Sequence, residues 1–297
     1  MEAHKQSQQE IREALLGRAL EGFSLVWGKP SAFLKLLDIC ERFNRAPDIV
    51  GGGPVNAMLV YLQRPQARQL VSNRQRTELG IYAKKGEHAL DILIGKKRQD
   101  RNTGRTAVWY NPEKAFDASQ LESAPEPEPE PPRRAWRDLV TAIGQGESAD
   151  TYRTVVSGAV PREMGVGFFP VGEGHATARI VFNGSLEREE FVACALKGIS
   201  HYILSKEERY AFGKESSFTA FCCGYYVCRR WGLETSGFSL GERDFPESVE
   251  NPGAVKEMVS GVIRAGNQVY AALEKELERA ARERAGPQNA LPGGGRR

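Results

Sequence analysis

The sequence of 297 residues predicts an α+β fold in two domains joined by a linker. Three observations support this prediction. Apolar residues recur at helical spacing near the start of the chain and again near its end. Short β-rich runs bounded by Gly and Pro lie in each half. Between the halves, SAPEPEPEPPRR at 123–134 alternates Glu with Pro, so it can form neither a helix nor a sheet ladder, and we assign a Glu/Pro linker to 123–135.

The first domain is expected to span residues 1–122 and to mix helices with strands. Each helical stretch is opened or closed by Gly, Pro or Ser. The expected helices cover 11–27, 31–43 and 55–62, and the expected strands cover ALDILIG at 89–95 and TAVWYNP at 106–112. The charged segment KKRQDRNTGR between these strands is expected to be a turn.

The second domain is expected to span residues 136–283, with a small sheet first and helices after it. A helix near AWRDLVTAI precedes the sheet, and the Gly- and Pro-rich tail at 284–297 is expected to be disordered. The expected strands are YRTVVSG, VGFFPVG and TARIVFNG, and the later helices run over 186–205, 217–231 and 254–281.

Composition narrows the compartment and the class of protein. No run of eighteen or more apolar residues occurs, and the polar start MEAHKQSQQE lacks a basic region leading into an apolar one. We therefore expect a cytoplasmic protein without a membrane partner. The five cysteines are an odd number, and four lie between Cys194 and Cys228 in apolar helical sequence, which predicts reduced, buried thiols.

Positive charge is concentrated in one segment, although the net charge is only +3. Residues 51–110 contain 11 Lys and Arg but 4 Asp and Glu, and they also contain Tyr61, Tyr82, Trp109 and Tyr110. Proteins hold single-stranded nucleic acid with a basic groove for the phosphates and aromatic platforms for the bases. The alternative is an ordinary solvated face of arginines beside aromatic residues that fill the core.

Several short motifs in this segment form a larger pattern. They are the helix start at Asn56 and Ala57, the turn QRP at 63–65, the turn KKGE at 84–87 and FDASQ at 116–120. This pattern resembles the amino-terminal domain of ArdC-like antirestriction proteins and LtrC-like proteins of mobile elements, with one departure near Arg76, where the family has a Trp. The resemblance implies that 1–122 bind single-stranded DNA. The candidate DNA-binding residues are Asn56, Tyr61, Arg64, Arg68, Arg74, Arg76, Tyr82, Lys84, Lys85 and Trp109.

A helix and the segment after it in the second domain resemble a zinc peptidase. KGISHYIL has the register of HELAHAIL, the zinc-binding helix of IrrE/ImmA-like and ArdC-like peptidase domains, and GYYVCRRWGLETSGFS resembles the ArdC-type stretch that follows the third ligand. The resemblance places the ligand positions at Lys197, His201 and Phe221, and the position of the general base at Gly198.

Three of these four positions have lost the required chemistry. A lysine ammonium repels a divalent cation, phenylalanine offers no lone pair, and glycine has no carboxylate to take a proton. We therefore expect a pseudo-metallopeptidase with no catalytic residue, no metal and no cofactor, in which His201 is a core histidine. The alternative is a rebuilt Cys/His site, because Cys194 lies two turns before His201 and Cys222 and Cys223 follow Phe221.

These observations predict a non-catalytic, single-stranded-DNA-binding accessory protein of a mobile genetic element, with a role in antirestriction or conjugation. Proteins of the mobile element or of a restriction system are its expected protein partners. Two alternatives remain at this point: a metal-dependent hydrolase with the rebuilt Cys/His site, and a protein-interaction module without DNA binding. A module of the second kind that mimics DNA would be acidic, whereas residues 51–110 are basic.

Overall fold

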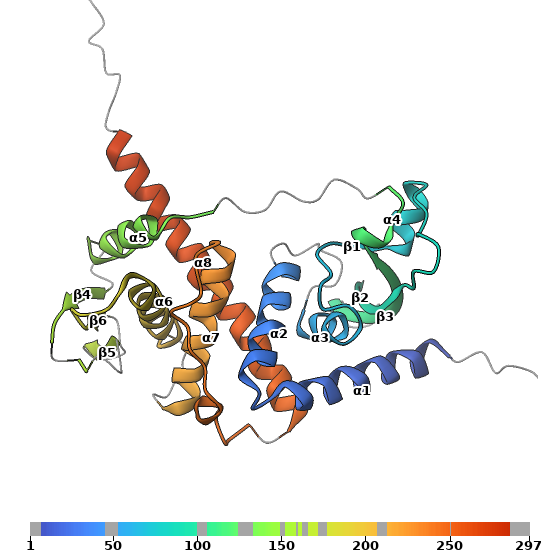
Figure 1. The fold of residues 1–297 in the computed structure, drawn as a ribbon, viewed down its shortest axis with the longest axis horizontal. Coiled ribbons are helices and arrows are strands. Elements are labelled where there is room, and N and C mark those ends of the chain that lie inside the picture. The colour runs from blue at the N-terminus through green and yellow to red at the C-terminus, as the bar shows by residue number, and fades with distance from the viewer. Residues whose placement is uncertain are drawn as a thin grey trace, which may run out of the picture. The chain divides into compact units, whose positions relative to one another are not determined.

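The structure is a computed structural model. It describes residues 7–44, 53–99, 106–123, 133–148, 152–158, 160–161, 166–171, 177–206, 213–249 and 251–285. The mixed α+β class predicted from the sequence is confirmed (Figure 1). Most of the predicted linker and most of the predicted tail lie outside the described residues. Within those ranges, no helix combines the length and the apolar character that a membrane span requires.

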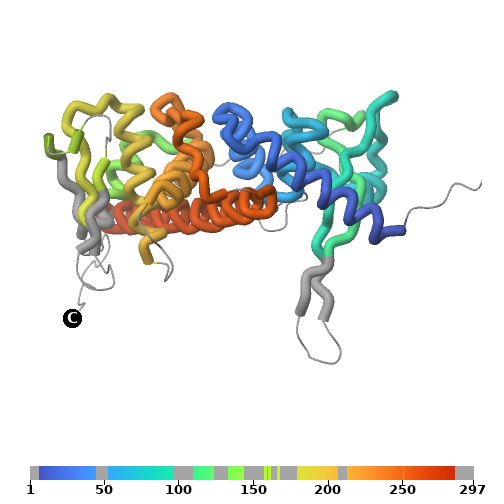
Figure 2. Tube along the Cα trace, turned by 90° about the horizontal axis from the view of Figure 1, so that it is seen from below, coloured from blue at the N-terminus to red at the C-terminus, as the bar shows by residue number. Residues whose placement is uncertain are grey.

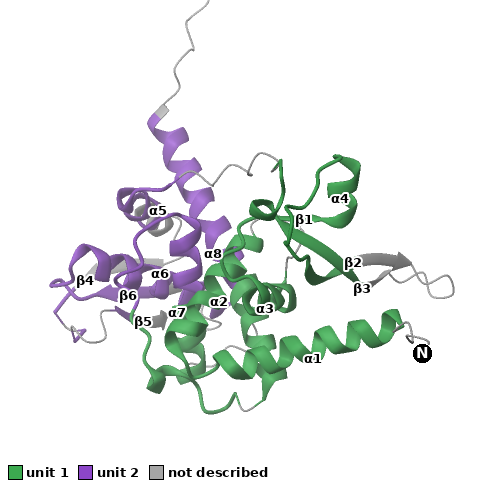
Figure 3. Cartoon of the chain, turned by 45° about the vertical axis from the view of Figure 1, so that its right-hand side comes forward, with its two compact units in different colours: residues 1–131, 212–222, 239–264 green, residues 132–211, 223–238, 265–297 purple. Residues whose placement is uncertain are grey.

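The chain divides into two compact units, drawn in different colours in Figure 3. The first unit contains residues 1–131 together with 212–222 and 239–264. The second contains residues 132–211, 223–238 and 265–297. Two segments from the second half of the sequence therefore belong to the first unit, and the domain boundaries drawn from the sequence stay a prediction.

Helices and an antiparallel sheet make up the first unit. Its helices are α1 (Gln8–Val26), α2 (Pro30–Phe43), α3 (Pro54–Gln63) and α4 (Asn73–Glu78), and its strands are β1 (Leu70–Ser72), β2 (Leu90–Gln99) and β3 (Thr106–Asp117), followed by the 3-10 helix η1 (Ala118–Gln120). The sheet has the order β1-β3-β2, and both pairings are antiparallel. Helix α3 packs against β2, and α1, blue in Figure 2, packs against β2 and β3.

Local sequence explains where the first helices begin. Ser7 and Glu10 form a capping box, in which the Ser7 hydroxyl accepts from the Glu10 N–H at 3.2 Å and the Glu10 carboxylate accepts from the Ser7 N–H at 2.7 Å. Pro30 and Pro54 open α2 and α3, because proline lacks only an N–H that the first turn leaves unpaired in any case.

The strands of the first unit differ from the expected ones. Strand β2 continues through KKRQ, which we expected to be a turn, and β3 continues past Pro112 to Asp117. Apolar and polar residues do not alternate at these positions, so the pattern predicted strands that end too early. The short elements β1 and α4 were also not predicted, because three and six residues are too few for a periodic pattern.

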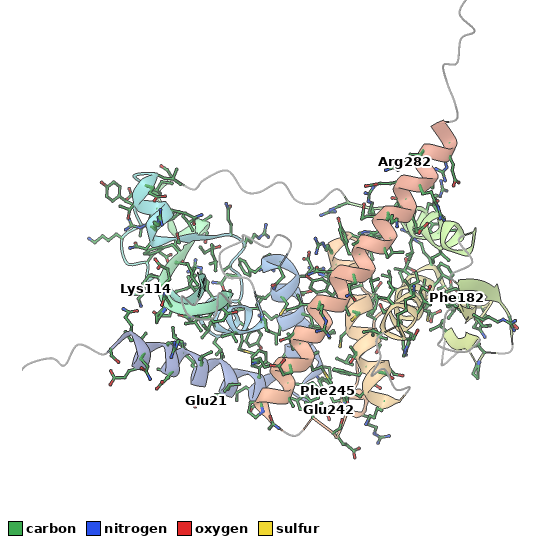
Figure 4. All side chains as sticks on the ribbon, turned by 180° about the vertical axis from the view of Figure 1, so that it is seen from behind. Glu21, Lys114, Phe182, Glu242, Phe245 and Arg282 are labelled. Carbon is green, nitrogen blue, oxygen red and sulfur yellow. The ribbon has the colours of Figure 1, made fainter. Side chains whose placement is uncertain are left out.

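The second unit combines a small mixed sheet with helices. It contains α5 (Trp136–Ser148), β4 (Tyr152–Val156), β5 (Val166–Val171), β6 (Thr177–Phe182) and α6 (Arg188–Leu204). Strand β6 lies between β4, to which it is parallel, and β5, to which it is antiparallel. Helix α6 packs on β5 and β6. Phe182 at the end of β6, labelled in Figure 4, is buried against Phe191 of α6 with ring centroids 5.1 Å apart.

The last two helices contribute residues to both units. Helix α7 (Lys214–Arg230) and helix α8 (Pro252–Ala285) are separated by the 3-10 helix η3 (Glu242–Asp244). Both long helices were predicted, although α7 begins three residues earlier than expected and α8 ends four residues later. A charged surface on the last turns of α8 made its end hard to read from apolar periodicity alone.

Candidate nucleic-acid interface

The outer edge of strand β2 is capped by two side-chain amides of helix α3. Asn56 donates to the Leu93 carbonyl at 2.7 Å and accepts from the Leu93 N–H at 2.8 Å. Two turns further along, Gln63 donates to the Asp91 carbonyl and accepts from the Asp91 N–H, both at 2.9 Å. The amides thus pair backbone groups of an edge strand that would otherwise lack ladder partners.

Asn56 therefore has a structural role and is buried in the fold, so it does not lie on a binding surface. Only 6% of the residue is exposed, and its amide is committed to Leu93 on both sides. We therefore leave Asn56 out of the proposed DNA contacts. The sequence could not distinguish the two roles, because an asparagine at a helix start fits a polar contact of either kind.

The motifs QRP, KKGE and FDASQ meet in one hydrogen-bonded network. The Glu87 carboxylate accepts from Arg64 at 3.2 Å and from the Gln120 amide at 2.7 Å. Asp117 accepts from the backbone N–H groups of Arg68 at 2.8 Å, of Gln69 at 3.2 Å and of Ser119 at 3.3 Å. These carboxylates neutralise Arg64, whose side chain is 23% exposed, so this predicted contact is largely occupied within the fold.

The network holds a turn that carries exposed side chains. The Lys84 N–H donates to the Gln120 carbonyl at 2.9 Å, and the Tyr82 carbonyl accepts from the Glu122 N–H at 2.9 Å. Gly86 has a φ of +86°, which the turn requires and which a residue with a Cβ rarely adopts. The backbone from Tyr82 to Lys84 is therefore held against residues 120–122, which follow β3.

Three of the predicted contacts are exposed on this turn. Tyr82 is 68% exposed, and Lys84 and Lys85 are exposed beside it. The Lys84 ammonium donates to the Ser119 carbonyl at 2.9 Å, which holds its charge close to the surface of the turn. We call Tyr82, Lys84 and Lys85 the Tyr82 turn. Its arrangement offers an aromatic face beside two cations.

The remaining predicted contacts differ in how freely they could reach a ligand. Arg68 is exposed, and Tyr61 is half-buried. Arg74 has a side chain that is 83% exposed and pairs with Glu78 at 2.8 Å, whereas Arg76 donates to the Ile81 carbonyl and lies over the Phe116 ring. Trp109 lies on β3, at the position paired with Lys96.

Sequence reasoning missed one exposed apolar residue near the Tyr82 turn. Leu79 directly follows α4, as its C-cap, and is 60% exposed. A leucine directly before Gly80 looks like the last buried position of a helix, so the sequence carried no signal of its exposure. Tyr110 on β3, which is 52% exposed, belongs to the basic and aromatic segment that the sequence did identify.

In the second unit, His201 is buried and lies near a positive charge. His201 is 7% exposed, and burial followed by the positive charge of Lys197 lowers its pKa to about 4. The Lys197 ammonium is thus close enough to disfavour positive charge at the imidazole. The loss of a zinc site at Lys197 and His201 stays a prediction from the residue types.

The structure gives Gly198 a packing role. A Cβ at this position would lie 2.8 Å from Cγ2 of Ile180 and 3.2 Å from Cγ2 of Val166. Glycine therefore allows α6 to approach β5 and β6 closely, and a longer side chain at 198 would be directed into the sheet. In the same unit, a Cβ at Gly224 would lie 3.0 Å from the backbone nitrogen of Lys197, so α6 and α7 also approach closely there.

Burial affects the thiols of two cysteines in the second unit, Cys194 and Cys228. Burial raises the pKa of Cys194 to about 11 and that of Cys228 to about 12. Metal binding requires the thiolate, which these values disfavour at neutral pH. Across the described ranges, no group of three or more His, Cys, Asp or Glu side chains could hold a metal ion. The rebuilt site with Cys194, Cys222, Cys223 and His201 therefore gains no support. None of the five cysteines forms a disulfide, and Cys194 is the half-buried one.

The third predicted ligand position falls outside the unit that contains the other two. Phe221 belongs to the first unit, while Lys197, Gly198 and His201 belong to the second. Phe221 is half-buried on α7. The peptidase-like register therefore stays a prediction from the sequence.

Comparison with known proteins finds similarity among solved structures. No protein-family model matches the chain, and no curated protein matches it. Among solved structures, the chain is similar to the metal-free structure of the antirestriction protein ArdC from plasmid R388, at 18% identity and a TM-score of 0.46, with 77% of this chain and 85% of that chain covered. It is also similar to the Mn(II)-bound structure of that protein, at 15% identity and a TM-score of 0.47, with 79% and 85% covered.

Proposed function

We propose that this protein binds single-stranded DNA without catalysing a reaction, and that the Tyr82 turn is the centre of its binding surface. The observation that carries the proposal is the 68% exposure of Tyr82 on a turn whose backbone is fixed by hydrogen bonds. Leaving an aromatic ring in water contributes nothing to folding, whereas a fixed ring with two lysines beside it suits an unstacked base and its phosphates.

Fixed geometry matters because a mobile turn would lose conformational entropy on binding. Gln120 and Glu122 hold the backbone of the Tyr82 turn before any ligand arrives. The ring and the ammonium groups are therefore ready for a ligand at a smaller entropic cost. Arg68 and Arg74, both exposed, supply further positive charge in the same unit.

We further propose that the second unit acts through binding and not through hydrolysis. Two features support this proposal: the charge of Lys197 contributes to the lowered pKa of His201, and Gly198 packs closely against Ile180. The motifs that resemble ArdC-like and LtrC-like proteins support a role as an accessory protein of a mobile element, in antirestriction or conjugation, with proteins of that element or of a restriction system as partners.

A titration of the full chain with a fluorescent single-stranded oligonucleotide tests the DNA-binding proposal. The variant Lys84→Glu/Lys85→Glu is expected to bind at least tenfold more weakly than the wild type. The control Arg18→Glu/Lys35→Glu makes the same change in net charge at two exposed positions on α1 and α2, and it should bind within about twofold of the wild type. If about four phosphates are contacted, the log–log salt slope should be about −3.

The tyrosine is tested separately from the charges. Tyr82→Ala should weaken binding about tenfold, because stacking of one base contributes about 1–3 kcal/mol, whereas Tyr82→Phe retains the ring and should bind like the wild type. Glu122→Gln, which removes an exposed negative charge beside Tyr82, should strengthen binding. Equal binding by the Lys84/Lys85 variant and its control would refute the proposal that the turn is a DNA contact.

A further inference from the structure

Among the residues that the structure describes, the two most exposed large apolar side chains lie three residues apart. Tyr82 is 68% exposed and Leu79 is 60% exposed, and the next is Leu25 on α1, at 58%. A single leucine on a surface is ordinary. Two such side chains on one short segment are neighbours, because Cα atoms three residues apart lie within about 11 Å of each other. Leu79 and Tyr82 therefore need an explanation as a pair.

Hydrogen bonds hold the backbone that carries Leu79. After α4, the Gly80 N–H donates to the Thr77 carbonyl at 3.1 Å, and the Ile81 N–H donates to the Arg76 carbonyl at 3.0 Å. These two bonds make a Schellman motif, in which Gly80 has the positive φ of +66° that the motif requires. The side-chain contact that usually accompanies this motif involves the position of Ile81. The helix end therefore does not require an apolar residue at position 79.

Positive charge lies beside the apolar pair. Lys84 and Lys85 follow Tyr82 and are exposed, and the Lys84 ammonium donates to the Ser119 carbonyl at 2.9 Å. Arg68 is also exposed, and its backbone N–H donates to Asp117, two residues before Ser119. These cations suit a polyanion that also presents apolar surface, and a nucleic acid with uncovered bases is such a ligand.

The two apolar side chains suit different surfaces of DNA. The flat ring of Tyr82 can stack on an unpaired base. A leucine is not flat, and proteins that place leucine against DNA use it as a wedge at a base step, where the stack is opened. Undistorted DNA uncovers the face of a base pair only where the duplex ends, because every other pair is stacked on both sides. A leucine next to a tyrosine therefore fits the last base pair of a duplex next to an unpaired base.

We infer that Leu79 and the Tyr82 turn together bind the junction at which a single strand leaves a duplex. In this arrangement Tyr82 stacks on the first unpaired base, Leu79 covers the last base pair, and Lys84 and Lys85 bind phosphates of the single strand. The inference rests on the proposed function, since it names the substrate class for the same site.

The experiment titrates the full chain with three fluorescent ligands. They are a single strand of about 10 nucleotides, a duplex that carries this strand as a tail at either the 5′ or the 3′ end, and the same duplex without a tail. The wild type should bind one of the tailed duplexes more tightly than the single strand or the blunt duplex, which offers no unpaired base to Tyr82. Part of this preference reflects the additional phosphates of the duplex, so the informative quantity is the ratio of the tailed-duplex and single-strand affinities in matched variants.

Leu79→Ala should lower this ratio about fivefold, because part of one apolar side chain is no longer covered by the base pair, and it should leave the single-strand affinity within about twofold of the wild type. Leu79→Met retains an apolar side chain of similar volume and should retain the ratio. The control Leu25→Ala removes an equally exposed leucine from the same unit without a change in charge, and its ratio should equal that of the wild type. Thermal melts of all three variants should match the wild type, since both positions are exposed.

The outcomes separate this inference from the function on which it rests. If the wild type binds no single-stranded DNA, the proposed function fails and the inference fails with it. If the wild type binds and Lys84→Glu/Lys85→Glu weakens binding, but Leu79→Ala and Leu25→Ala give the same ratio, the proposed function stands and the inference is overturned. An equal loss of affinity for the single strand and the tailed duplex in Leu79→Ala would also overturn it, because Leu79 would then contact the single strand alone.

Discussion

The ring of Phe245 meets the ring of Trp27 edge to face, with centroids 4.9 Å apart and planes inclined by 87°. Phe33 and Phe218 complete the cluster, with centroid distances to these rings and to each other of 5.0–5.6 Å. Phe245, labelled in Figure 4, lies just after Glu242 in the segment before α8. Residues from both ends of the sequence thus form one part of the core of the first unit.

Removing one ring of this cluster should destabilise the protein. Phe245→Ala is expected to lower the free energy of unfolding by about 3–5 kcal/mol, because a buried aromatic side chain is lost and a cavity remains. Urea unfolding measures the change. Glu242→Ala, an exposed neighbour, should stay within about 0.5 kcal/mol of the wild type. The same reasoning predicts that residues 1–122 alone are less stable than the full chain, so equal stability of this fragment would contradict the importance of the cluster.

The capping of β2 predicts a structural role for Asn56. Asn56→Ala leaves the N–H and C=O of Leu93 without their side-chain partner, at a cost of about 1–3 kcal/mol in the free energy of unfolding. At temperatures where the variant is folded, its affinity for single-stranded DNA should equal that of the wild type. A folded variant with normal stability and weakened DNA binding would instead make Asn56 a contact.

Two glycines in helices form a matched pair. Gly198→Ala should destabilise the protein by up to about 2 kcal/mol, since overpacking against the fully buried Ile180 costs about 1–3 kcal/mol and the gain in helix propensity offsets about 1. Gly261→Ala in α8 meets nothing within 4 Å and should stabilise by about 1 kcal/mol. Urea unfolding measures both changes. If both variants raise the free energy of unfolding, Gly198 is not in close contact with Ile180.

Stability should depend on pH through His201. Its folded pKa of about 4 lies below the ordinary value of 6.5, so the unfolded chain binds the proton first as the pH falls. The contribution of neutral His201 to the free energy of unfolding is fully present above pH 6.5. About 3 kcal/mol of this free energy should be lost as the pH falls from about 6.5 to about 4. Urea unfolding at pH 7 and pH 5 measures this loss, which His201→Gln should reduce. An unchanged pH dependence in that variant would assign the effect to other groups.

Added zinc should leave the melting temperature unchanged. A site occupied at 100 times its dissociation constant would stabilise the folded state by about 2.7 kcal/mol, which a thermal melt detects readily. The charge of Lys197 and the protonated thiols of Cys194 and Cys228 lead us to expect no such shift. A zinc-dependent rise that His201→Gln abolishes would favour the rebuilt Cys/His site and a metal-dependent hydrolase.

The sequence by itself determined the α+β class and the long helices, and it predicts the loss of chemistry in the peptidase-like motif. Apolar periodicity over many residues predicts helices such as α6 and α8 because burying one face is what stabilises them. The predicted loss at Lys197 and Gly198 follows from the residue types. An ammonium has no lone pair to replace an imidazole as a zinc ligand, and glycine has no carboxylate to accept a proton.

Only the tertiary structure decided what individual polar and small residues do. Asn56 and Leu93 are 37 residues apart, and Trp27 and Phe245 come from distant parts of the chain, so no local pattern records either contact. The structure also placed Gly198 against Ile180 and left Tyr82 exposed while Arg64 became engaged with Glu87. Hydrogen-bond partners and packing neighbours are set by the meeting of separate elements, whereas periodicity reports only which face of one element is buried.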